Sequence, residues 1–149
     1  DGVMNEYIKN ETEKRSLHKI HILPYQPRES MPSLLTYSDI QFIFMSPETE
    51  KDGFPSKVYT IMACARPLLV CSSFDTPIVN FLSDKECAYI ITEKDIKNKI
   101  ENATSILRNI SRDDLIMKGK NGYNHIINNY TKPIIANKYV NLVNKLLNS

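Results

Sequence analysis

The sequence predicts an α/β fold in which parallel strands alternate with helices. Three observations indicate this class: short apolar runs typical of buried strands, helical segments between those runs, and a helical tail. The expected strands cover residues 18–23, 40–45, 68–71 and 87–91. Because strict alternation requires right-handed crossovers, we expect a three-layer parallel sheet of four strands followed by C-terminal helices.

The first 39 residues are expected to form two helices and one strand. Residues 4–16 combine a few apolar side chains with many charges, which predicts a short, largely solvated helix. Residues 18–23 alternate polar and apolar side chains and stop at a proline, which predicts a strand. After the Pro-rich loop 24–30, Ser30 can cap a helix that extends to Asp39.

The rest of the chain repeats a strand–helix pattern. Residues 40–45 are nearly all apolar, which predicts a strand buried on both faces, and the polar loop 46–55 is long for a strand-to-helix connection. Ser111 with Asp114 resembles a capping box at the start of a late helix. The remaining expected helices are 56–65, 76–82, 95–109, 112–130 and 133–147.

Composition excludes several classes of protein. The 149 residues are 42% hydrophobic and 24% charged, as in ordinary globular domains, and the formal net charge of +2 does not favour binding to nucleic acid. No apolar run approaches the roughly 20 residues that a membrane-spanning helix needs. Of the three cysteines, Cys64 and Cys71 lie in apolar segments, so we expect core thiols in a reducing compartment.

The loop 46–55 is the strongest candidate for a binding site, since open α/β sheets bind ligands beyond the carboxyl ends of their strands. Gly53 permits backbone geometries closed to other residues, and a helix begins just after it. The free N–H groups of the first turn of this helix, the Ser56 hydroxyl and the Lys57 ammonium together suit a phosphate or pyrophosphate. The alternative is that Gly53 belongs to an ordinary turn and Lys57 is a solvated lysine, and spacing alone favours that alternative.

Other candidates for chemistry are weaker. His18 and His21 lie on opposite faces of the expected strand, so they are not expected to share a metal. His125 is expected to be a surface or packing residue. Tyr25 could stack on a nucleobase or simply pack in its loop.

Residues 52–70, DGFPSKVYTIMACARPLLV, resemble the donor-binding segment of the family 4 retaining glycosyltransferases, which have the two-domain GT-B fold. In that family a glycine-containing loop, a proline, a helix with a Met-Ala pair and a small-x-Pro-hydrophobic strand follow in this order. The Pro-Ser-Lys version resembles a subgroup that builds bacterial surface polysaccharides, including colanic-acid and amino-fucose transferases. Residues 22–27, residues 34–40 and the C-terminal tail are also similar to that subgroup, so the resemblance covers essentially the whole chain.

This resemblance implies a Rossmann-like domain that binds a nucleotide-diphosphate sugar. Gly53 and Phe54 amides, with Ser56 and Lys57, would hold the diphosphate, and a loop with Tyr25 and Gln26 would lie by the base. No metal and no cofactor are implied, because basic groups neutralise the leaving group. The enzyme would transfer a hexosyl or N-acetylhexosaminyl group, with retention, to a lipid-linked or saccharide acceptor in bacterial cell-surface polysaccharide biosynthesis.

The sequence departs from the family at one acidic pair. The family commonly has two glutamates eight positions apart, near the donor sugar and the ribose, and the corresponding residues here are Asp52 and Thr60. Asp52 keeps a carboxylate and is the candidate catalytic residue, whereas Thr60 offers only a hydroxyl to the donor. Glu48 or Glu50 could replace the first glutamate.

The resemblance also implies that residues 1–149 form only part of the C-terminal, donor-binding domain. The chain begins Asp1-Gly2-Val3 without an initiator Met, so we expect a fragment that is inactive without its N-terminal acceptor domain. We expect a cytoplasmic protein, free or peripheral at the inner face of the plasma membrane. The alternative function is a non-catalytic Rossmann-like nucleotide-binding or interaction module, which the loss of the glutamate pair supports.

Overall fold

The computed structural model describes residues 4–148 and separates into two compact units that divide after Leu34. The first unit contains α1 (Asn5–Lys14), η1 (Arg28–Ser30) and the beginning of α2 (Met31–Tyr37). Helix α1 buries none of its residues, as expected for a solvated helix. The expectation that the chain is a fragment was based on residues 1–3, and these residues lie outside the described part of the chain.

The strand expected at residues 18–23 is absent, and this prediction was wrong. These residues form a turn and irregular backbone, and Ile20, Ile22 and Leu23 are exposed. The alternating pattern satisfies the periodicity of a strand, but a strand is stable only when its backbone pairs with a neighbour. Within residues 4–148 the sheet has three strands rather than the four expected.

The second unit is built on a parallel sheet in the order β1-β2-β3. Strands β1 (Gln41–Phe44), β2 (Leu68–Cys71) and β3 (Ala88–Ile91) pair in register, with Leu68 opposite both Gln41 and Ala88. All four residues of β2 are buried. The expected α/β class is therefore confirmed, with β2 at the centre of the core.

Strand β1 is buried on one face only, which corrects the expectation of burial on both. Ile43 is 2% exposed, whereas Phe42 and Phe44 are 43% and 67% exposed. Ala103 and Ile106 of helix α5 pack on the core cluster of Leu69, Cys71 and Ile91, which belongs to β2 and β3. The helix therefore covers the middle and far strands and leaves Phe44 of the edge strand open.

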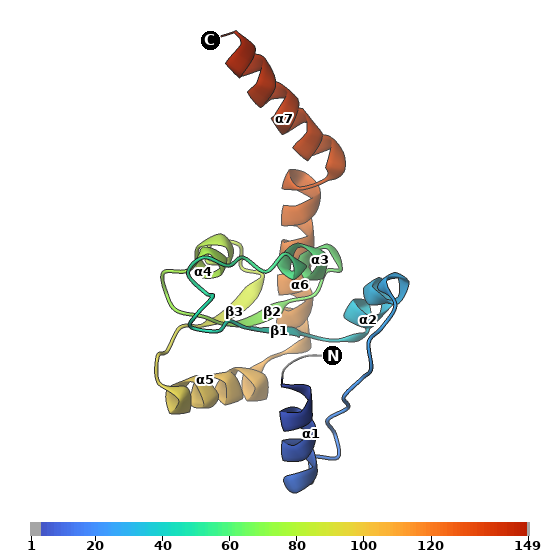
Figure 1. Ribbon diagram of the computed structural model, residues 1–149, viewed down its shortest axis with the longest axis vertical. Coiled ribbons are helices and arrows are strands. Elements are labelled where there is room, and N and C mark those ends of the chain that lie inside the picture. Colours follow the sequence, from blue (N-terminus) through green and yellow to red (C-terminus); the bar gives the residue numbers. More distant parts are fainter. Residues whose placement is uncertain (1–3, 149) are drawn as a thin grey trace. The chain divides into compact units, whose positions relative to one another are not determined.

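Helices cover both faces of the sheet, giving the three layers of a Rossmann-like domain. Helices α3 (Lys57–Ala63) and α4 (Pro77–Leu82) lie on one face, and α5 (Ile96–Asn109) lies on the other (Figure 1). Helix α6 (Arg112–Asn129) packs on α3 and is followed by α7 (Lys132–Leu147). In the described part of the chain, no helix combines the length and apolar character needed to cross a membrane.

Two glycines bring α6 very close to its neighbours. A Cβ at Gly119 would lie 2.2 Å from the Ala65 carbonyl oxygen, in the turn between α3 and β2. A Cβ at Gly122 would lie 3.3 Å from Cys87 Cβ and from Met62 Cγ. Ala65 itself has a left-handed backbone with φ 53°, an uncommon conformation for alanine. The contact of α6 with this turn therefore depends on the missing side chain of Gly119.

Of the two hydrogen bonds of the expected capping box at the start of α6, only the one accepted by Ser111 forms. The Ser111 hydroxyl accepts a hydrogen bond from the Asp114 N–H at 3.1 Å, which confirms Ser111 as the N-cap. The Asp114 carboxylate instead accepts a hydrogen bond from the Tyr89 hydroxyl. Burial, together with this carboxylate, raises the pKa of Tyr89 above its usual range. The acidic residue thus connects α6 to strand β3.

Candidate functional site

Five of the expected binding residues follow one another along the segment that joins β1 to α3. Gly53 and Phe54 end the loop, Ser56 and Lys57 stand at the start of α3, and Thr60 lies one turn later. Because the loop follows β1, the segment lies beyond the carboxyl end of that strand, where open α/β sheets bind ligands.

Gly53 is required here by close packing rather than by an unusual φ angle. No glycine in the described chain has a positive φ, so the expected role in a special backbone geometry is not observed. Instead, the Gly53 N–H donates to the Thr49 carbonyl at 2.8 Å, and a Cβ at Gly53 would lie 2.6 Å from that oxygen. The Gly53 amide is therefore already used by the turn.

Free backbone N–H donors lie at Ser56 and Lys57, at the start of α3. The N–H groups of Val58 and Tyr59 donate to the carbonyls of Pro55 and Ser56, at 3.0 and 3.2 Å. Among the described residues, no hydrogen bond engages the N–H of Ser56 or of Lys57, and the Ser56 hydroxyl makes no capping bond. Both side chains are exposed. Two amides, a hydroxyl and an ammonium are therefore available to an anion at this point.

Phe54 is held in place by a cluster of aromatic rings. Its centroid lies 5.4 Å from that of Tyr59 and 5.2 Å from that of Phe81 in α4. His125 and Tyr130 extend the cluster, at 5.7 and 6.1 Å from Phe81. Such ring pairs stabilise by roughly 0.5–1.5 kcal/mol each beyond their buried area. The cluster therefore connects the end of the loop to α3, α4 and the end of α6.

His125 is a packing residue of this cluster, as the sequence suggested among its alternatives. Burial, with Lys85 nearby, lowers the pKa of His125, and its Nε2 atom is buried without a hydrogen-bond partner in the described chain. Lys85 also lies over the Phe81 ring, with its Nζ atom 4.6 Å from the centroid. The imidazole is therefore favoured in its neutral form, as expected for a ring packed against other rings.

A buried carboxylate holds the middle of the loop. Glu50 is 7% exposed, and its Oε2 accepts hydrogen bonds from the Ser73 N–H at 2.8 Å and the Ser72 hydroxyl at 3.1 Å. Its Oε1 accepts from the Ser73 hydroxyl. The Ser73 hydroxyl, followed by the Ser73 N–H, lowers the pKa of Glu50 below its ordinary value of 4.5 against the opposing effect of burial. Glu50 thus joins the loop after β1 to the loop after β2.

The other acidic candidates are exposed. Asp52 makes no hydrogen bond or ion pair within residues 4–148. The Glu48 carboxylate accepts from the Ser46 hydroxyl, which lowers the pKa of Glu48. Thr60 borders an open groove of about 450 Å³ together with Tyr59, Ala63, Ile126 and Tyr130.

Tyr25 and Gln26 belong to the first compact unit, and the residues of loop 46–55 belong to the second. Tyr25 is 80% exposed, and the Gln26 side-chain amide donates to the Pro24 carbonyl at 2.9 Å. The exposed ring is available to a partner.

Residues 4–148 contain no group of three or more His, Cys, Asp or Glu side chains that could hold a metal ion. His18 and His21 are both exposed.

Sequence reasoning missed Glu50 as the buried carboxylate and Phe81 as the centre of the ring cluster. The only local signal for the first was the Ser72-Ser73 pair after β2, at the same edge of the sheet as loop 46–55. Nothing local distinguished Phe81, since its partners lie in α3, the loop and α6.

Comparison with protein families supplies the remaining evidence. The family model for glycosyl transferases group 1 matches residues 1–122, a stretch that contains β1 to β3 and the whole loop segment. Comparison with curated proteins gave no match. A group 1 glycosyltransferase domain implies a sugar donor, an acceptor and transferase activity in general. With most of its length matched and a Rossmann-like α/β fold, the chain belongs to the group 1 glycosyl transferase family.

Proposed function

We propose that this chain is the donor-binding part of a retaining family 4 glycosyltransferase. Its donor is a nucleotide-diphosphate sugar, and its acceptor is a lipid-linked or saccharide molecule in bacterial cell-surface polysaccharide biosynthesis. The transferred group is a hexosyl or N-acetylhexosaminyl residue, and the acceptor is bound by an N-terminal GT-B domain in another part of the protein. The family match across the loop segment carries the proposal, and the Pro-Ser-Lys sequence at residues 55–57 supports the subgroup.

The start of α3 is proposed as the diphosphate site. The Ser56 and Lys57 N–H groups lack partners in the described chain, and both side chains are exposed beside them. Helix α3 has only seven residues, so the Lys57 ammonium is expected to supply most of the positive charge. Charge on the leaving diphosphate would grow as the glycosidic bond breaks, and a fixed cation stabilises such a transition state. Phe54 would position the segment through its ring contacts.

Asp52 is proposed as the carboxylate near the donor sugar. It is exposed and has no partner in the described chain, whereas Glu50 is buried and fully engaged by Ser72 and Ser73. Glu50 is therefore a poor replacement for the family's first glutamate. Thr60 would offer a hydroxyl to the ribose, and the exposed Tyr25 ring, with Gln26, would contact the base.

Calorimetric titration with UDP and GDP tests the diphosphate site. Hydrogen bonds to charged groups contribute about 1.5–3 kcal/mol, so Lys57→Ala should weaken binding at least about tenfold. The matched control is Lys97→Ala, an exposed lysine on α5 whose side chain lies 3.9 Å from Glu101. Equal affinities for Lys57→Ala and the unsubstituted chain would show that the lysine has no phosphate role.

A second candidate is a non-catalytic nucleotide-binding or interaction module. One observation favours it: the position of the family's second glutamate holds Thr60, which has no carboxylate. A sugar-transfer assay with the full-length protein separates the two candidates. Turnover that Asp52→Asn abolishes supports the enzyme, and nucleotide binding without turnover for any donor supports the module.

A further inference from the structure

A second pocket lies at the end of the sheet opposite to loop 46–55. It has a volume of about 270 Å³ and lies where Asp39 precedes β1 and the Ala65-Arg66 turn precedes β2. The pocket therefore lies at the amino ends of the strands, whereas the proposed diphosphate site lies beyond their carboxyl ends. Its lining includes Asp39, Arg66, Arg112, Ile116, Lys120 and Tyr123.

One wall of the pocket is a single face of α6. Arg112, Ile116 and Lys120 are spaced four residues apart, and Tyr123 follows on the same side. The other wall is the Ala65-Arg66 turn, which α6 approaches because Gly119 has no side chain. The geometry of the fold therefore brings Arg66 beside a helix that carries Arg112 and Lys120.

The charges of the pocket are unbalanced and unpaired. Two arginines and one lysine line the pocket with one carboxylate, Asp39, and no ion pair or hydrogen bond in the described chain engages any of the four side chains. The Arg66 Nε atom is buried and has no hydrogen-bond partner there. A buried donor without an acceptor is costly, by roughly 1–3 kcal/mol. An anion in the pocket would remove that cost.

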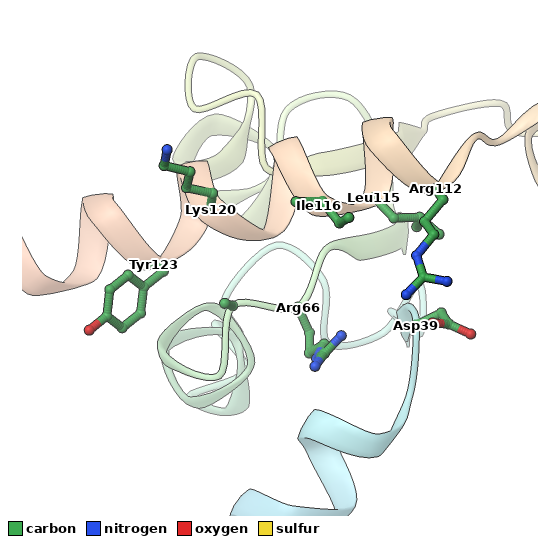
Figure 2. A pocket seen from close by; sticks show the side chains of 8 residues that line it. Asp39, Arg66, Arg112, Leu115, Ile116, Lys120 and Tyr123 are labelled. Atoms are coloured by element: carbon green, nitrogen blue, oxygen red, sulfur yellow. The ribbon is translucent and has the colours of Figure 1, made fainter.

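The arrangement of the side chains indicates the kind of anion. Figure 2 shows the guanidinium groups of Arg66 and Arg112 on the same side of α6, near Asp39, while the Lys120 ammonium points away. Two planar guanidinium groups suit the oxygens of a phosphate, which each can bind in a bidentate manner. Ile116, which follows Arg112 by one turn of α6 and is 59% exposed, offers an apolar surface beside them, and Tyr123 lies further along the helix.

We propose that this pocket binds a small phosphate monoester, with the phosphate between Arg66 and Arg112 and its organic part against Ile116. The volume of about 270 Å³ lies just below the range of pockets for drug-sized ligands, so the organic part is small. Lys120 adds attraction at longer range, and Asp39 opposes it. The inference does not rest on the proposed function, since none of these residues belongs to the loop segment.

Nuclear magnetic resonance on the whole 149-residue chain tests the proposal, with phenyl phosphate as the probe. The Arg66 Nε–H signal should shift and saturate during the titration, and inorganic phosphate should bind more weakly because it lacks the ring. Vesicles of phosphatidylcholine with and without phosphatidic acid provide a parallel arm, in which a shift specific to phosphatidic acid identifies a lipid as the source of the phosphate. No shift with any of these phosphates overturns the proposal.

Substitutions then locate the binding energy. Arg112 is exposed, so Arg112→Gln should fold normally and weaken phenyl phosphate binding by about tenfold or more. Asp39→Asn should strengthen binding, because it removes the opposing charge. The matched control is Arg108→Gln, an exposed arginine in the last turn of α5 and outside the pocket. Equal affinities for Arg112→Gln and Arg108→Gln would overturn the assignment.

Discussion

Gly119 is the point at which α6 meets the turn between α3 and β2. Replacing it with alanine would place a Cβ 2.2 Å from the Ala65 carbonyl oxygen and 2.9 Å from its carbonyl carbon. Both are backbone atoms, so no side-chain rotation can relieve the overlap, and α6 must move by about 1 Å to restore an ordinary contact.

The size of the effect follows from two opposing contributions. Overpacking in a close-packed interior costs typically 1–3 kcal/mol, and the better helix propensity of alanine returns about 1 kcal/mol. Since the overlap is with backbone, we expect the upper part of the first range and a net loss of about 1–2 kcal/mol in unfolding free energy. In a chain of this size that loss lowers the melting temperature by about 2–8 °C.

Thermal and urea unfolding followed by circular dichroism measure this loss. The control is Gly122→Ala on the same helix, where the new Cβ would lie 3.3 Å from the nearest atoms and Met62 can adjust its side chain. Its effect should be clearly smaller. If Gly119→Ala were as stable as the unsubstituted chain, the inferred contact between α6 and the turn would be wrong. Gly119→Ala should also weaken phenyl phosphate binding, because α6 forms one wall of that pocket.

Three further predictions concern the bonds that hold the candidate site and its supporting helix. Glu50→Gln should lower the unfolding free energy by about 1–3 kcal/mol at neutral pH, because it weakens bonds to buried donors. Since the folded pKa of Glu50 lies below 4.5, the wild-type advantage is present above that pH and shrinks as the pH falls further; an advantage independent of pH in urea titrations would contradict this. Ser111→Ala should cost about 0.5–2 kcal/mol by removing the α6 cap, whereas Ser105→Ala on α5 should cost little; equal losses in thermal unfolding would refute the cap. Phe81→Leu should cost about 1–3 kcal/mol through its lost ring contacts, and an unchanged urea midpoint would show that the aromatic cluster contributes nothing.

Local sequence patterns predicted the elements of the second unit closely. The predicted strand Leu68–Cys71 coincides with β2. A central strand of a parallel sheet is buried on both faces, so all of its residues are apolar and the strand can be recognised from sequence. Ser111 predicted the start of α6, because its cap is a bond between residues three apart.

The failures all involve partners that are distant in the sequence. Residues 18–23 have the alternation of a strand, but periodicity does not provide a neighbouring strand. The apolar Phe42 and Phe44 suggested burial, but their exposure depends on where α5 packs. Glu50 bonds to serines 22 and 23 residues away, so its role could not be found from the loop alone.

Most donors of the predicted phosphate site are free in the structure, and one expected donor is not. Gly53 was expected to offer its amide, and the structure shows that Thr49 accepts that N–H. Ser56 and Lys57 remain as donors without partners in residues 4–148. A glycine in a motif therefore did not reveal which backbone groups the turn would use.

The two attachments of the loop have a consequence for how a ligand would bind. Glu50 is fixed to the loop after β2, and Phe54 is fixed among the aromatic rings, so only three residues, 51–53, span the interval between them. Fixing a flexible residue costs about 1–2 kcal/mol of conformational entropy, and a three-residue segment already held at both ends has little of that entropy left to lose. The candidate site is preorganised, so a ligand at Ser56 and Lys57 would keep most of its interaction energy as affinity.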